Sequence, residues 1–536
     1  MNGKTFIKGA AILGIAGLLV QILGAVFRIP LANIIGEEGM GYFQTAYPIY
    51  IFLLVFSTNG APAAISKMTS ERIAQGNYSE AHRIFKISFI LMIIIGIVTS
   101  MAVFLGAEAI VNYFGDPGAY YAMIAIAPAL LFVPIMAVFR GYFQGYQVMG
   151  PTAGSQLTEQ LVRVAVGLTL AVVLVPSGIE YAAAGASGAG SIGPVFGTLF
   201  ILFVFMIAKK DKSLPFDDGN TEGFLPETKG TILKKLAGIA VPITIGVSIF
   251  PIMNLMDLLV VMRRLQDVGF TSAEANALYG QLSGYAGPII NIPQALALAV
   301  SLSLVPAIAA AKSVGDKPFM DQNIRLGLRT AFIIGVPCSL GLMLMAGPII
   351  DLIYPMQAEG ADAAVSCLFW LGAGVVFICV AQAMAGILQG LGRPMLSVVG
   401  IAAGAAVKYI VSYLLIGVDI LNVSGAAIGT SAGLFTVALV NMYFVKKTEE
   451  TTHDIKLAVV RPLICGGLMA AAVVIINYGI GAFTDSRIIT ILAIAAAAAV
   501  YGVALIKTKT ILPEEIKTLP KGEKLYGLLV KLRMVN

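Results

Sequence analysis

The sequence predicts an all-α polytopic membrane protein with about fourteen transmembrane helices, on three observations. The chain of 536 residues is 58% hydrophobic and only 12% charged, whereas a soluble domain carries roughly 25% charged residues. Apolar stretches near the roughly 20 residues needed to cross a bilayer follow one another along the whole chain. The polar gaps between them are too short to fold a soluble domain.

Hydropathy alone places the spans. The first one follows Lys4 and resembles a signal peptide, but its apolar run is longer than a signal's and a second span follows closely, so we expect an uncleaved helix. The predicted spans are 7–34, 42–65, 85–110, 119–143, 157–176, 188–208, 234–262, 282–311, 326–350, 363–389, 395–417, 424–445, 457–478 and 487–506.

The basic residues lie almost entirely on one side of these predicted spans. When alternate gaps are counted from the N-terminus, 29 of the 35 Lys and Arg residues fall in one set. Cytoplasmic loops carry such an excess of positive charge. We therefore predict an even number of spans with the N- and C-termini both in the cytoplasm.

The chain also contains an internal repeat. Arg140-Gly-Tyr-Phe-Gln-Gly closes the fourth span, and Ala385-Gly-Ile-Leu-Gln-Gly closes the tenth, with Pro151 and Pro394 following at similar distances. Parallel repeats are common in transporters, which bind substrate between the two halves. We predict an N-terminal lobe at 1–208, a cytoplasmic linker at 209–233, a C-terminal lobe at 234–446, two extra helices at 447–507 and a cytoplasmic amphipathic tail at 508–536.

Charged residues inside or at the edges of spans are costly, so they are candidates for a substrate path. Five of them are basic and two are acidic, so a cavity that they shared would be positive and would suit an anionic group such as a phosphate. Two plainer interpretations remain open: some arginines could snorkel to the interface, and Glu159 could neutralise Arg163 four residues later. The candidates are Arg28, Glu159, Arg163, Asp257, Arg263, Arg264 and Lys408.

Prolines and amides add a second group of candidates. Interrupted helices at membrane depth line cavities or pack within protein, and the seventh span carries two prolines and the eighth three. We therefore add Asn254, Asn291 and Gln294 to the predicted substrate-binding residues, and predict gating roles for Pro62, Pro288 and Pro293.

Known catalytic signatures are missing from the sequence. There is no Walker-type phosphate loop, no His-Glu-x-x-His motif and no Ser/His/Asp set. The two histidines, His82 and His453, fall in predicted polar loops, and the four cysteines lie scattered in apolar spans as small hydrophobic residues. We predict no enzymatic activity, no metal and no cofactor. Transport could be coupled to Na⁺, to H⁺ or to the membrane potential.

Several short motifs resemble a known family. Phe27-Arg28-Ile29-Pro30, the following Ile35-Gly36 and Gly41-Tyr42-Phe43, and Gly386-Ile-Leu-Gln-Gly-Leu-Gly-Arg-Pro394 are similar to the polysaccharide-transporter branch of the multidrug/oligosaccharidyl-lipid/polysaccharide exporter superfamily. Within it the chain most resembles the stage V sporulation protein B group, which includes lipid II flippases. The resemblance implies a V-shaped bundle of two six-helix lobes plus two helices, in a bacterial plasma membrane.

In that family basic residues line a central cavity. The resemblance places this role on Arg28 and on Arg263 or Arg264, with Asp257 as a polar neighbour. The hypothesis is a flippase that moves an undecaprenyl-diphosphate-linked saccharide, foremost lipid II, to the outer leaflet. Its expected partners are that anionic lipid, membrane lipids and cell-wall synthesis enzymes, with no nucleic acid.

Three alternatives stay open at this stage. The first is an exporter of another lipid-linked polysaccharide or a teichoic-type precursor. The second is a cation-coupled multidrug antiporter, which would need an essential acid in the first lobe; the first span, Ile7–Ile34, contains no Asp or Glu. The third is a non-transporting scaffold for cell-wall enzymes.

Overall fold

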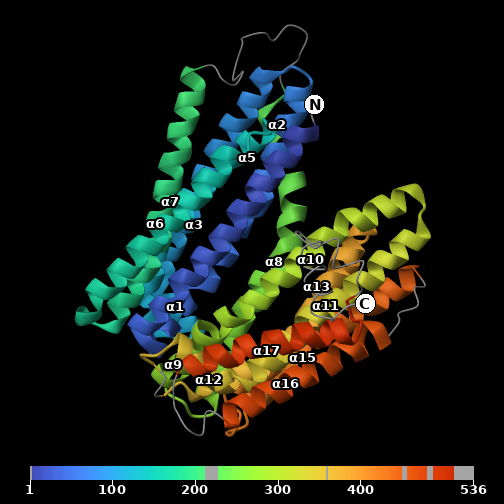
Figure 1. Ribbon diagram of the computed structural model, residues 1–536. Coiled ribbons are helices and arrows are strands. Elements are labelled where there is room, and N and C mark those ends of the chain that lie inside the picture. The colour runs from blue at the N-terminus through green and yellow to red at the C-terminus, as the bar shows by residue number, and fades with distance from the viewer. Residues whose placement is uncertain (1–2, 212–226, 358–359, 450–455, 480–486, 512–536) are drawn as a thin grey trace. The chain divides into compact units, whose positions relative to one another are not determined.

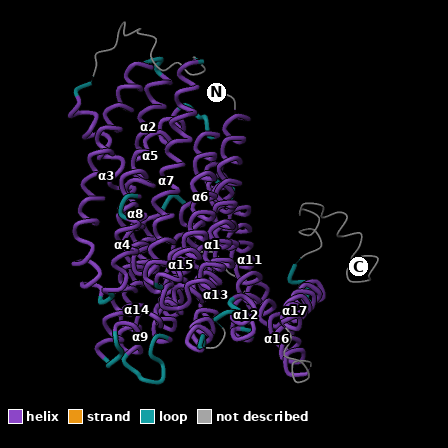
Figure 2. The backbone as a smooth tube through the Cα atoms, turned by 90° about the vertical axis from the view of Figure 1, so that its left-hand side faces the viewer, coloured by secondary structure: helices purple, strands orange, loops and turns teal. Residues whose placement is uncertain are grey.

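The computed structural model describes residues 3–211, 227–357, 360–449, 456–479 and 487–511. Throughout these ranges the backbone forms helices joined by short turns, as predicted, and no strand occurs among them (Figures 1 and 2). The chain divides into two compact units, residues 1–284 and 285–536. The lobe boundaries that we predicted from the repeat remain predictions, and most of the predicted tail and linker lies outside the described residues.

The helices of the first unit run side by side as a bundle (Figure 1). Helices α6 and α7 pack against each other along their lengths, and both contact α1. The elements are α1 (Gly3–Val55), η1 (Phe56–Gly60), α2 (Ala61–Ala74), α3 (Tyr78–Phe114), η2 (Pro117–Ala119), α4 (Tyr120–Ile126), α5 (Ala129–Gly145), α6 (Gly150–Leu174), η3 (Val175–Ser177), α7 (Ile179–Lys210), α8 (Lys229–Asp267) and α9 (Ser272–Gly280).

The second unit is a further helical bundle. Helix α13 lies at its centre, since α10, α11 and α15 all pack against it. The elements are η4 (Gln281–Ala286), which begins in the first unit, α10 (Gly287–Val314), α11 (Lys317–Leu344), α12 (Ala346–Ile353), α13 (Asp362–Gly390), α14 (Pro394–Ile416), α15 (Ser424–Glu449), η5 (Lys456–Val460), α16 (Arg461–Gly479) and α17 (Arg487–Lys507).

The described residues contain 12 helices that are long and apolar enough to cross a membrane. The predicted count of fourteen is not confirmed, and the difference arises at two places. The first two predicted spans lie in one segment, Ile12–Val55, bent at Gly36, whose φ of 67° and ψ of −171° are not helical. The seventh predicted span lies in α8, which is not among the twelve.

Local sequence signals set several helix ends. Asn77 caps α3 by accepting a hydrogen bond from the Glu80 amide, and Thr271 and Glu274 form a reciprocal capping box at α9. Helix α3 ends at Gly115, whose φ of 81° lies in the left-handed region that glycine adopts without strain. These caps satisfy backbone groups that the helix itself leaves unpaired.

The prolines do not interrupt the helices as the sequence suggested. Helix α8 continues through Pro242 and Pro251, and α10 continues through Pro293. The irregular backbone lies directly before two of the helices. The π-helical turns η1 and η4 end where α2 and α10 begin, and these helices carry Pro62 and Pro288 in their first turns. Such turns often mark functional positions in helices. Gating at Pro62, Pro288 and Pro293 stays a prediction.

One expectation about loops is wrong. His82 lies within the first turns of α3 rather than in a polar loop, where its ring stacks on Phe85 at 5.7 Å. Its Nδ1 also lies 3.3 Å from the Tyr142 hydroxyl of α5. The aromatic neighbours Phe85 of α3 and Tyr142 of α5 explain why a histidine is tolerated in this helix. His453 lies outside the described residues.

Candidate functional site

Arg28 lies in α1, half-buried, against an aromatic side chain of the same bent helix. Its guanidinium carbon is 5.1 Å from the centroid of the Tyr47 ring, within the range of a cation–π contact. Among the described residues it forms no ion pair. A guanidinium presents five N–H donors, and a ring face occupies none of them, so these donors remain for an anionic group.

A largely buried ion triplet lies between α5 and α6 of the same unit. Glu159 accepts from Arg163 at 3.1 Å, as the spacing of four residues predicts, and also from Arg140 at 3.0 Å. Arg140 donates in addition to the Ser155 hydroxyl at 2.9 Å. All three charged side chains are only 14–16% exposed. The triplet therefore holds a net charge of about +1 inside the bundle.

Arg140 is the partner that sequence reasoning missed. The sequence shows it as the first residue of the repeat motif that closes the fourth span, and gives it no role in binding. In the structure it lies within α5 and faces the first half of α6. The close packing of α6 on α7 fixes this geometry, because a Cβ added at Gly193 would lie 2.7 Å from the Glu159 carbonyl oxygen.

Aromatic side chains of α1 connect Arg28 with this triplet. The Tyr47 ring stacks on Phe43 at 5.7 Å and lies 6.0 Å from Tyr50, and the Tyr50 side chain interacts with Arg163. Two predicted binding residues, Arg28 and Arg163, are therefore joined through two tyrosines. Arg163 is held by its neighbours, whereas the contact that the described residues offer to Arg28 is the Tyr47 ring.

The candidates of α8 lie elsewhere in the first unit. Arg263 donates through Nε and Nη2 to the Tyr113 carbonyl oxygen, at 3.2 and 2.7 Å, and its guanidinium carbon lies 4.5 Å from the Tyr113 ring centroid. Arg264 lies 4.0 Å from Asp267. Asp257 is half-buried and close enough to Tyr279 of α9 to act on its electrostatics, and Asn254 is exposed.

The other candidates belong to the second unit. Lys408 of α14 is 9% exposed, and its stem packs where α15 has no side chain: a Cβ added at Gly433 would lie 2.8 Å from the Lys408 Cβ. In α10, Asn291 is exposed, Gln294 is half-buried and Pro293 is buried. Binding roles for these residues stay predictions.

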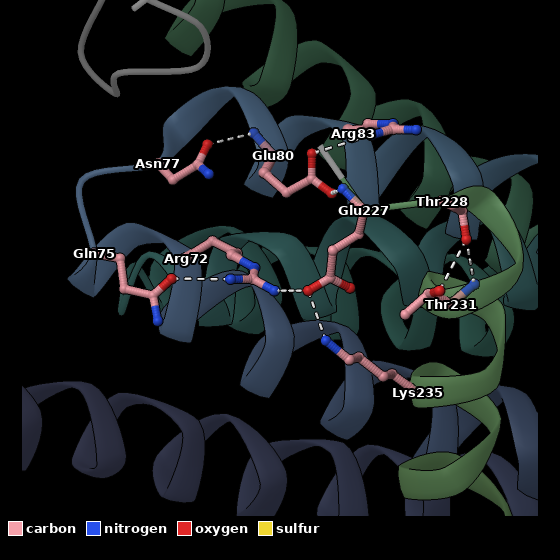
Figure 3. A network of polar contacts seen from close by, with 9 residues as sticks. All are labelled: Arg72, Gln75, Asn77, Glu80, Arg83, Glu227, Thr228, Thr231 and Lys235. Carbon is pink, nitrogen blue, oxygen red and sulfur yellow. Dashed lines mark hydrogen bonds and ion pairs between the residues drawn. The ribbon is translucent and has the colours of Figure 1, made fainter. Parts of the chain in front are cut away.

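A second polar network lies where α8 begins (Figure 3). Glu227, two residues before α8, accepts from Arg72 of α2 and, at 2.6 Å, from Lys235 of α8. Its backbone N–H donates to Glu80 of α3 at 3.3 Å. Lys235, by its hydrogen bond, and Arg72, by its charge, hold the pKa of Glu227 below its usual value. The network ties the start of α8 to α2 and α3.

We expect Glu227→Gln to loosen the first turn of α8. Ion pairs that water reaches contribute roughly 1 kcal/mol or less, which is about fivefold in an opening equilibrium. Amide hydrogen exchange of residues 229–235 should therefore accelerate about fivefold at low salt and less at high salt. Glu71→Gln, at an exposed position of α2, is the matched control; equal exchange in the two variants would contradict the role of Glu227.

Comparison with known proteins identifies the family. The model of the polysaccharide biosynthesis protein family matches residues 6–312. The uncharacterized membrane protein YabM of Bacillus subtilis is 31% identical, over 97% of this chain and 95% of its own. The lipid II flippase MurJ of the same bacterium is 26% identical, over 94% and 95%.

Solved structures share the fold. An inward closed structure of the lipid II flippase MurJ matches with a TM-score of 0.68 at 17% identity, covering 92% of this chain and 97% of that one. An inward-facing multidrug resistance transporter of the MOP superfamily matches with a TM-score of 0.69 at 15% identity, covering 82% and 98%. The chain therefore belongs to the polysaccharide biosynthesis protein family and is a multi-pass membrane protein that shares the fold of these two solved structures.

Proposed function

We propose that the protein flips an undecaprenyl-diphosphate-linked saccharide, foremost lipid II, from the inner to the outer leaflet of the bacterial plasma membrane. The observation that carries the proposal is Arg28. It is a half-buried guanidinium in a membrane-spanning helix with an aromatic face for support and no ion pair within the described residues. Such a group binds a diphosphate through charge-assisted, bidentate hydrogen bonds.

The charge of the first unit supports an anionic substrate over a cationic one. The acid found between α5 and α6, Glu159, is already neutralised by Arg140 and Arg163 and is therefore not available to a transported cation. The surplus positive charge repels cations and attracts phosphate. The 26% identity to a lipid II flippase over nearly the whole chain supports the same choice.

An inside-negative membrane potential would favour this direction of transport. Moving a negative charge outward gains about 2.3 kcal/mol per charge for each 100 mV. A diphosphate headgroup could therefore be exported by voltage alone, with Na⁺ or H⁺ coupling as the alternative. Removing the potential with an ionophore that carries K⁺ separates the two: voltage-driven export stops, while ion-coupled export persists as long as the ion gradient does.

The decisive test is Arg28→Ala in cells depleted of their own lipid II flippase, with lipid II in the outer leaflet as the readout. Loss of a hydrogen-bonded charge pair costs roughly 1.5–3 kcal/mol, so we expect binding and export to fall about 10- to 100-fold. Arg28→Lys should recover part of the loss, because a lysine keeps the charge without the bidentate geometry.

Arg393→Ala is the matched control, since this arginine is exposed and lies before α14 in a predicted cytoplasmic turn. It should export lipid II normally. Normal export by Arg28→Ala, at equal protein levels, would remove the binding proposal. If the wild-type protein exports a different lipid-linked saccharide but no lipid II, that saccharide would replace lipid II as the proposed substrate.

A further inference from the structure

Asp116 occupies the two-residue link between α3 and η2, and it is 1% exposed. Its Oδ2 accepts a hydrogen bond from the Thr45 hydroxyl of α1 at 2.7 Å, and Thr45 is itself fully buried. The link is short and held in place, because the preceding Gly115 adopts a left-handed conformation and η2 begins at Pro117. The carboxyl group is therefore enclosed by the bundle and does not point into water.

The groups that face Asp116 are acidic or phenolic. Glu38 and Tyr42 face it from α1, Glu180 from α7 and Tyr279 from α9. Arg263 of α8, a helix that packs against α3, is occupied by the Tyr113 carbonyl oxygen and ring.

In the described part of the chain, no Lys, Arg or His pairs with Asp116. A buried carboxylate without a cation is costly, and the cheapest remedy is to bind a proton.

The electrostatics agree with this geometry. Burial raises the pKa of Asp116 to about 7, and the charges of Glu38 and Glu180 add to the effect. The Thr45 hydroxyl and the Ala119 amide act in the opposite direction, because they stabilise the charged carboxylate. The carboxyl group therefore changes its protonation in the neutral pH range, where an ordinary surface aspartate is fully ionised.

Helices α8 and α9 also form hydrogen bonds with this link. Gln266 of α8 and Ser272 of α9 both donate to the Gly115 carbonyl oxygen at 2.7 Å. The side chain of Asp116 thus contacts α1 through Thr45, while the carbonyl group of the preceding Gly115 contacts the junction of α8 and α9. A change in the charge of Asp116 therefore alters its bond to Thr45 within a link whose backbone also contacts α8 and α9.

We propose that Asp116 is a proton-binding site whose occupancy sets how α1 is held against the junction of α8 and α9. The predicted topology has this link on the outer face of the membrane, so the site would respond to the outer pH. A protonated carboxyl can itself donate a hydrogen bond, whereas the carboxylate can only accept one. The proposal is independent of which lipid the protein carries, since no substrate contact enters it.

Infrared difference spectroscopy tests the proposal directly on the full-length protein in nanodiscs. The carbonyl stretch of a protonated, buried carboxyl should appear as the pH is lowered, with a midpoint near 7. Asp116→Asn should abolish this band, and Asp419→Asn, at an exposed turn between α14 and α15, should leave it unchanged. The same band and midpoint in Asp116→Asn would overturn the proposal.

Two further variants test the proposal even if Asp116→Asn fails to fold. Thr45→Val removes the hydrogen bond that favours the carboxylate, so the midpoint should rise by about one pH unit. Glu38→Gln removes a neighbouring negative charge, so the midpoint should fall. A midpoint that moves in neither variant would also overturn the proposal.

Discussion

Glu159→Gln is expected to destabilise the protein by about 3–5 kcal/mol, which is the usual effect of removing one partner from a buried ion pair. The substitution keeps the shape of the side chain but leaves Arg140 and Arg163 without their shared counter-ion. Neither arginine can reach water easily, since both are about 15% exposed and lie between packed helices. The apparent melting temperature of the purified protein should fall by several degrees.

The prediction has a matched control and an internal check. Glu108→Gln makes the same chemical change on α3, at an exposed position, and should have little effect. Arg140→Gln leaves the neutral pair of Glu159 and Arg163 and should cost less than Glu159→Gln. The double variant Glu159→Gln/Arg163→Gln should recover part of the loss, because coupled charges are not additive. Equal melting temperatures for Glu159→Gln and Glu108→Gln would exclude the triplet as a source of stability.

Only part of the triplet could be predicted from the sequence. The pair of Glu159 and Arg163 follows from a spacing of four residues on one helix, so it could be predicted. Arg140 lies on another helix, and nothing in its own neighbourhood distinguishes it from a basic residue that marks the cytoplasmic side. Its partner is set by the packing of α5, α6 and α7, which depends on glycines such as Gly193 whose contacts are nonlocal.

The helices themselves were easier to predict than their boundaries. Hydropathy located nearly every span because the bilayer length is a strong constraint. It could not show that the chain continues as one bent helix through Gly36, nor that α8 is tied to α2 and α3 at Glu227 and to Tyr113 at Arg263. Those features depend on one backbone conformation and on contacts between residues far apart in sequence.

Asp116 was missed as a candidate for a related reason. In the sequence it stands between glycine and proline in an apparent turn, where an aspartate is usually solvated. Its burial arises from α1, α7 and α9, which come from distant parts of the chain. Only the assembled bundle turns an ordinary turn residue into an enclosed carboxyl group.

The second large effect that we predict is a dependence of stability on pH that Asp116 alone produces. The folded protein holds the proton up to a pKa of about 7, while the unfolded chain releases it near 3.9. Between these two values the folded state binds more protons, so the free energy of unfolding must fall as pH rises, by about 1.4 kcal/mol per pH unit. Below the lower value and above the upper one, this contribution is constant.

Asp116→Asn should therefore be more stable than the wild type at pH 8 and no more stable than it at pH 4, because asparagine never carries the buried charge. The full difference approaches about 4 kcal/mol, the free energy of about three pKa units. Apparent melting temperatures of the two proteins, measured in parallel from pH 4 to 8, isolate this contribution, since titrating groups that do not interact with Asp116 cancel in the difference. Asp419→Asn should show no such trend, and a difference between Asp116→Asn and the wild type that stays constant across this range would mean that Asp116 remains ionised in the folded protein.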